Sequence, residues 1–206
     1  MSNINQKTNI SYTDSFELFL KEHAEIFESM SILHTFSSQK YNRYSVMINL
    51  PVIFISSVIG FLNVINIFTD QNILLGSISI LISLFKSIES YMQYTKRSES
   101  HRMLSLSYSK MSKLIQSNLI LSRDERQDAR SLYEMVINTQ QNLNESAPTI
   151  DKDIIDKFNT IYKDYNTKKP TICNGLTDVK IHSGFTPKED NNIELTRLES
   201  QVNINM

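Results

Sequence analysis

The most distinctive pattern in the chain is a pair of long apolar runs separated by a short polar segment. The first run, about residues 46–68, lies between Arg43 and Asp70, and no charged residue occurs between these two. The second run follows Asp70 closely and stays uncharged up to Lys86. A helix needs roughly 20 apolar residues to cross a hydrocarbon core of about 30 Å. We therefore interpret the two runs as a transmembrane helical hairpin with spans at about residues 46–68 and 72–94.

The second span reaches the required length only if its helix continues through Lys86 and Glu89 to Tyr94. Lys86 would then lie about 21 Å along the helix, where its long side chain can extend to the headgroups. Glu89 follows one turn later and can pair with it. Two alternatives remain open: a charged ring at the mouth of a pore, and a buried hairpin within a soluble protein.

Basic residues flank the two runs on one side only. Lys40 and Arg43 precede the first run and Lys96 and Arg97 follow the second, whereas the connecting loop contains only Asp70. The positive-inside rule then places both termini in the cytosol, and aromatic rings favour the headgroup level. The residues that we predict at the membrane interface are Arg43, Tyr44, Lys86, Tyr91, Tyr94, Lys96 and Arg97.

Apolar residues at intervals of three and four predict further helices outside the runs. One amphipathic helix begins at Asp14 and leads into the first span, and another continues from the second span to about Leu119. These cytosolic extensions can pair as a coiled coil. Ser122 and Glu125 form a capping-box pattern that predicts a helix over residues 123–144.

Asp151 is predicted to cap a short last helix that continues through Tyr165, before breaker residues become frequent. The expected organisation is a flexible tail over residues 1–13, a helical domain over 14–165 and a mostly flexible tail over 166–206. The fold class is therefore all-α, with a two-span hairpin, long cytosolic extensions and two further short helices.

Little in the sequence points to catalysis or to a bound cofactor. The formal net charge is −1, and the chain contains one cysteine and four glycines. These counts argue against a nucleic-acid surface, a disulfide framework and a phosphate-binding glycine loop. The histidines have no metal-ligand spacing and are interpreted as interfacial or surface residues; they are His23, His34, His101 and His182. We expect no enzymatic activity, no cofactor, no metal and no nucleic-acid partner.

Each predicted span carries a stripe of small or hydrogen-bonding residues. The stripe of the first span consists of Asn49, Ser56, Gly60 and Asn63, and that of the second of Asn72, Gly76, Ser79, Ser83 and Ser87. Small residues let helices approach closely, and a hydrogen bond between helices contributes about 0.6 to 2 kcal/mol. The stripes either pack helices together, within the hairpin or between copies, or line a water-filled pore. One hairpin has too few helices to enclose a channel, so a pore requires a homo-oligomer.

Several short motifs resemble the SLATT family, which comprises two-transmembrane effector domains associated with nucleotide-second-messenger conflict systems. The first set is Tyr41-Asn-Arg43-Tyr44, Pro51 near the start of the first span, and Glu99-Ser-His101 leading into Tyr108. A second set resembles SLATT-like membrane proteins encoded by large DNA viruses: Ala147-Pro148, Lys157-Phe158-Asn159 and Ile172-Cys173-Asn174-Gly175-Leu176. The resemblance covers about residues 14–176 and implies a membrane protein that oligomerises and perforates or perturbs membranes.

Together these observations predict a non-enzymatic integral membrane protein that contacts the lipid bilayer and assembles into homo-oligomers. Its expected role is to form or gate a pore, in a host membrane or a virion internal membrane. Because the chain contains no nucleotide sensor, a triggered role would require a separate sensor protein. The alternative is a structural or scaffolding membrane protein of a large DNA virus whose hairpin is only an anchor.

Overall fold

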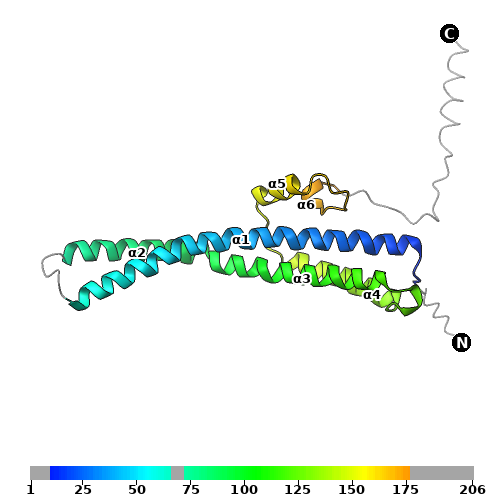
Figure 1. The fold of residues 1–206 in the computed structure, drawn as a ribbon, viewed down its shortest axis with the longest axis horizontal. Coiled ribbons are helices and arrows are strands. Elements are labelled where there is room, and N and C mark those ends of the chain that lie inside the picture. Colours follow the sequence, from blue (N-terminus) through cyan, green and yellow to red (C-terminus); the bar gives the residue numbers. More distant parts are fainter. Residues whose placement is uncertain (1–9, 66–71, 177–206) are drawn as a thin grey trace, which may run out of the picture. The chain divides into compact units, whose positions relative to one another are not determined.

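The computed structural model describes residues 10–65 and 72–176, and every regular element in these ranges is a helix (Figure 1). The chain is therefore all-α, as predicted. The helices are α1 (Asp14–Ile65), α2 (Asn72–Met92), α3 (Tyr94–Ile120), α4 (Ala129–Ser146), α5 (Lys152–Ile161) and α6 (Thr171–Asn174), with a 3-10 turn, η1, at Arg123–Glu125. The predicted loop around Asp70 and most of both predicted tails lie outside the described residues.

Helix α1 contains 52 residues, which corresponds to a length of about 78 Å. It begins where the sequence predicted, at Asp14, and the Thr13 hydroxyl accepts a hydrogen bond from the Phe16 backbone N–H at 3.3 Å. The helix includes both the amphipathic extension and most of the first apolar run. The residues of this run beyond Ile65 lie outside the described part of the chain.

A single residue, Gln93, separates α2 from α3. Its φ of 51° and ψ of 39° place it in the left-handed region, which a residue with a side chain rarely adopts. The Gln93 N–H still bonds to the Glu89 carbonyl, and the Arg97 N–H bonds to the Gln93 carbonyl. The predicted continuous helix to Tyr94 is therefore interrupted at Gln93, although both flanking hydrogen bonds are retained.

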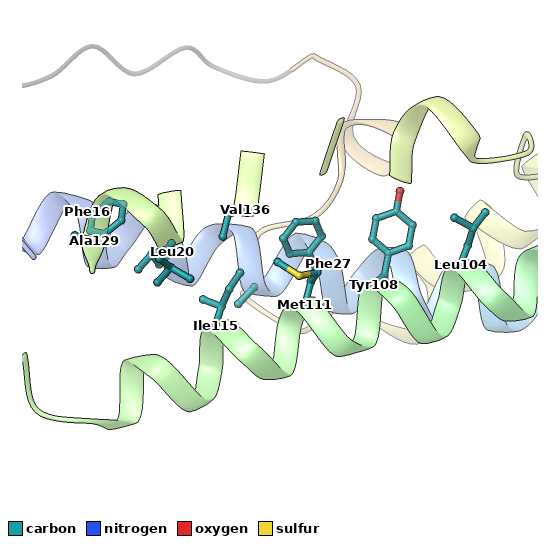
Figure 2. Close-up of a cluster of buried hydrophobic side chains, with 11 residues drawn as sticks. Phe16, Leu20, Phe27, Leu104, Tyr108, Met111, Ile115, Ala129 and Val136 are labelled. Carbon is teal, nitrogen blue, oxygen red and sulfur yellow. The ribbon is translucent and has the colours of Figure 1, made fainter. Parts of the chain in front are cut away.

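Helices α1 and α3 run antiparallel and form the main helix pair, and α4 covers one side of it (Figure 1). Figure 2 shows the side chains of these three helices meeting in one core. Its buried members are Phe16, Leu20, Ala24, Phe27, Leu104, Tyr108, Met111, Ile115, Ala129, Leu132 and Val136. The pairing of the two predicted extensions is thus observed. We refer to the part of the chain that contains this core as the helical bundle.

A second cluster joins α5 to α1. Leu33 of α1 is buried together with Ile150, Ile154 and Phe158, and Cys173 packs against the same cluster. The segment after α5 also contacts α1, because the Lys168 N–H donates to a Glu25 carboxylate oxygen at 2.7 Å. The compact helical unit consequently extends to Asn174, beyond the boundary at residue 165 that composition suggested.

The predicted helix over residues 123–144 begins later than the capping-box pattern indicated. The Ser122 hydroxyl donates to the Glu125 carboxylate at 3.0 Å instead of capping a helix, and residues 123–125 form only η1. Helix α4 starts at Ala129, where the Asp128 carboxylate accepts a bond from the Ser131 N–H. The prediction was wrong because Arg123 and Arg126 both bond to Glu17 of α1, a tertiary contact that competes with local capping.

Candidate functional site

The second half of α1 is the strongest candidate for contact with a membrane. Among the described residues, α1 is the one helix that is long and apolar enough to cross a bilayer, judged by length and composition alone. Its large side chains are uncovered: Leu50 is 63% exposed, Phe54 68% and Phe61 64%. Over the described residues, α2 is not among the helices that meet this standard. The second span therefore stays a prediction.

The stripe residues of both predicted spans are largely uncovered within one chain. Helix α1 exposes Ser56, Gly60 and Asn63, and α2 exposes Gly76, Ser79, Ser83 and Ser87. The side chain of Asn72 lies outside the described part of the chain. A Cβ atom added at Gly60 or Gly76 would meet nothing within 4 Å. No other part of the described chain therefore packs closely against either glycine.

The stripe serines of α2 satisfy their hydroxyls within their own helix. Ser79 donates to the Leu75 carbonyl at 2.9 Å, Ser83 to the Ser79 carbonyl at 3.0 Å, and Ser87 to the Ser83 carbonyl at 2.8 Å. These bonds satisfy each hydroxyl proton while leaving the oxygen free to accept a bond from outside. The stripe of α2 is thus compatible with lipid, with a second copy or with water.

Where α1 meets the junction of α2 and α3, polar side chains form a small network. Lys86 donates to the Asn49 carbonyl oxygen, and the Asn49 amide donates to Ser45 at 3.0 Å. Ser45 contacts Thr95 at 2.8 Å, and Thr95 donates to Glu89 at 3.1 Å. Asn49 is thus a predicted stripe residue that bonds to the other predicted span. The Lys86 side chain thus bonds to α1, whereas the sequence predicted that it extends to the headgroups.

Tyrosines and basic residues lie together at the same junction. The ring of Tyr94 is 5.6 Å from that of Tyr44 and 6.4 Å from that of Tyr41, measured between centroids. The Arg97 guanidinium lies over the Tyr41 ring, 5.8 Å from its centroid. The remaining predicted interface residues are exposed side chains: Arg43, Tyr91 and Lys96.

On the bundle side of this junction, α1 is tied to α5 by a group of side chains that we call the carboxylate clamp: Lys40, Tyr41, Asp151 and Asp153. The Lys40 ammonium lies 2.8 Å from Asp151 and 2.7 Å from Asp153, and the Tyr41 hydroxyl donates to Asp151 at 2.9 Å. The Lys40 ammonium lowers the pKa of Asp151 below its usual value. Asp151 was predicted to cap α5, but its side chain makes no capping bond, and α5 ends at Ile161 instead of Tyr165.

The sequence interpretation missed a buried pair of histidines. His34 and His101, 0% and 1% exposed, contact each other through their Nδ1 atoms at 2.8 Å. His34 stacks on Tyr108 with ring centroids 5.5 Å apart, and His101 stacks on Tyr41 at 5.6 Å. We call these four residues the histidine layer. Each histidine occupies a core position in the three-four spacing of its helix, which was the only sequence signal available.

Burial dominates the acid–base behaviour of the histidine layer. Burial and, as the smaller cause, the neighbouring His101 together lower the pKa of His34 to about 4. Burial also lowers the pKa of His101, with Asp151 opposing and Arg97 reinforcing the shift. Both rings are therefore neutral near pH 7. One Nδ1–H then donates to the Nδ1 lone pair of the other ring.

The described residues contain no group of three or more His, Cys, Asp or Glu side chains that could hold a metal ion. Comparison with known proteins adds no assignment: no protein-family profile, no curated protein and no solved structure matches the chain.

Proposed function

We propose that this chain is a non-enzymatic integral membrane protein that forms homo-oligomers and, as an oligomer, forms or gates a pore. In this proposal both α1 and α2 cross the bilayer, and both termini lie in the cytosol. The single observation that carries it is the contrast along α1. Its first half buries its apolar side chains in the helical bundle, whereas its second half leaves large apolar residues and the stripe uncovered.

The uncovered residues support assembly because one chain cannot cover them. Exposed apolar patches of this extent are uncommon on soluble monomers and mark contact with lipid or with another protein. Small residues such as Gly60 and Gly76 allow close helix packing, and nothing in the described chain occupies the space next to them. Neighbouring copies would fill this space, and the remaining stripe serines would face the axis of the assembly.

The junction supports the two-span arrangement. Lys86 lies far along α2 and reaches Asn49 of α1, so its charge is partly satisfied by the hairpin itself. Tyr94 lies against Tyr44 and Tyr41, and Arg97 lies over the Tyr41 ring, a grouping expected at a headgroup boundary. The resemblance to SLATT proteins agrees with this proposal, and a separate sensor protein would provide any trigger.

Liposome leakage by the full chain tests the proposal. Purified protein reconstituted at several protein-to-lipid ratios should release a small trapped dye. The double variant Ser79→Leu, Ser83→Leu should abolish release if these side chains face water. Ser77→Leu is the matched control, because Ser77 is also exposed and also bonds to a carbonyl of its own helix, at Ile73, but lies about 100° away from Gly76 around α2.

Two results would count against the proposal. Absence of leakage at every ratio, with oligomers present in cross-linking, would favour the scaffolding alternative in which the hairpin is only an anchor. Equal loss of leakage in the stripe variant and in Ser77→Leu would show that added bulk, not the stripe, is responsible.

A further inference from the structure

The histidine layer lies at the end of the bundle that is nearer to the predicted spans. His34 precedes the first predicted span by 12 residues, or about 18 Å of helix. The layer joins α1 to α3, which are the helices that continue directly into the two predicted spans. A change in the contact between α1 and α3 at this layer would therefore be transmitted to the start of both spans.

We propose that His34 and His101 act as a proton-sensitive latch, in which protonation of both rings breaks the contact between α1 and α3 beside the membrane. The geometry leads to this directly. A neutral pair, or a pair that shares one extra proton, can place a hydrogen between its Nδ1 atoms at 2.8 Å. Two imidazolium rings cannot, because both Nδ1 atoms then carry a hydrogen and a positive charge.

The charged groups around the layer do little to balance the positive charge of a second imidazolium ring. Arg97 and Asp151 act on His101 with opposite charges. Asp151 is paired with Lys40, which also binds Asp153, so these four groups together are formally neutral. Both carboxylates are already paired with Lys40. Lys157, also on α5, adds a further positive charge nearby, where its ammonium lies over the Phe36 ring. No excess negative charge therefore remains in this set to balance a second imidazolium.

The stacked tyrosines do not change this conclusion. An aromatic face attracts one cation by about 0.5 to 2 kcal/mol, and Tyr108 and Tyr41 each present a face to one histidine. Each tyrosine face could therefore stabilise one imidazolium ring. It does not relieve the repulsion between two imidazolium rings whose Nδ1 atoms are in contact. His34 has a further deficit, because its buried Nε2 has no hydrogen-bond partner among the described residues. Opening the layer would give this atom access to water.

The latch does not depend on the existence of a pore, so it is tested by opening of the bundle itself. The probe is a cysteine at Ser37, which is buried one turn from His34, in a Cys173→Ser background of the full chain in lipid nanodiscs. The rate of thiol labelling, divided by the rate of a short peptide with the same cysteine, reports the open fraction. Ser112→Cys, also buried between α1 and α3 but about three helical turns from His101, is the matched control position.

Acidification should open the layer by a predictable factor. With a pKa of about 4 when closed and 6.5 when open, His34 alone raises the ratio of open to closed molecules about thirtyfold between pH 7.5 and pH 5. The labelling ratio at Ser37→Cys should rise by at least this factor, and that at Ser112→Cys by less. The double variant His34→Phe, His101→Phe keeps the aromatic stacking and should remove the rise.

Two further variants keep the test decisive. His34→Gln retains an amide that can bond to His101, and should reduce the rise to a few-fold if the double variant fails to fold. His23→Gln removes a histidine of α1 that bonds only to its own helix, at Phe19, and should leave the rise unchanged. The latch is overturned if labelling at Ser37→Cys does not change with pH, or if the rise persists undiminished in His34→Gln.

Discussion

The two halves of α1 are built for different surroundings. In the first half, inward-facing side chains such as Leu20, Phe27 and Leu33 are almost completely buried, and polar residues occupy the other faces. Within the predicted first span, of which residues 46–63 have described side chains, only Val52 is buried. One continuous helix therefore passes from a region that completes its own core to a region that does not. The difference teaches that the first half of α1 completes a core within one chain, whereas the described residues leave most of residues 46–63 uncovered.

The difference in packing between the two halves is tested most directly by truncating one phenylalanine in each half. Phe27 is 1% exposed and Phe54 is 68% exposed on the same helix. Phe27→Ala should lower the free energy of unfolding of the bundle by about 3 to 5 kcal/mol, through lost burial and a cavity. Phe54→Ala should change it by less than about 0.5 kcal/mol. Urea titrations in mild detergent measure both values, and equal losses would show that the second half is packed after all.

The stability of the bundle should depend on pH through two separate groups, His34 and Asp151. Because the pKa of His34 is about 4 in the bundle and 6.5 when unshifted, the unfolded chain binds more protons between these values. Stability should therefore fall by about 3 kcal/mol as the pH falls from 7 to 4. The pKa of Asp151 is lowered from 3.8, so its contribution is complete above that value and is lost below it.

Urea midpoints measured from pH 7.5 down to pH 3 would resolve the two contributions. The double variant His34→Phe, His101→Phe should make the profile shallower above pH 4, where His23, whose pKa burial also lowers, still contributes. It should leave the lower part unchanged, whereas Asp151→Asn should affect mainly the lower part. A profile that is flat from pH 7 to pH 4 in the unmodified chain would contradict the assignment to His34.

A smaller effect distinguishes tertiary ion pairs from local ones. Asp151→Asn removes a carboxylate that binds Lys40 and Tyr41 across helices and should destabilise the bundle by about 1 to 2 kcal/mol, because the side chains are only partly exposed. Glu134→Gln breaks an exposed pair with Arg130 four residues earlier, and should cost about 0.3 to 0.5 kcal/mol. Thermal unfolding of the two variants at pH 7 gives the comparison.

The smallest expected change concerns the hairpin alone. Gly76→Ala adds a methyl group into empty space, so it should leave a single chain unchanged or stabilise its helix by about 0.5 to 1 kcal/mol. If neighbouring copies pack on this glycine, the same methyl group should weaken their association. Sedimentation or cross-linking at several detergent concentrations distinguishes these outcomes, and unchanged association would remove Gly76 from any interface between copies.

Much of the bundle was predictable because a helix that buries one face repeats its apolar residues at a fixed period. Leu104, Tyr108, Met111 and Ile115 follow this three-four spacing along α3, and all are buried. Capping signals were less reliable, since they depend on what else a side chain can reach. Asp151 and the segment from Ser122 to Arg126 make long-range contacts with α1 instead of the predicted local ones.

The sequence by itself determined the all-α fold, the start of α1 and the apolar composition of its second half, because these follow from local periodicity and hydrophobicity. The tertiary structure alone decided which polar groups meet. His34 and His101 are 67 residues apart in the chain, and Lys40 and Asp151 are 111 apart. No local pattern encodes such contacts, since they depend on how antiparallel helices are aligned. The same alignment covers the first half of α1 and leaves the stripe of its second half open.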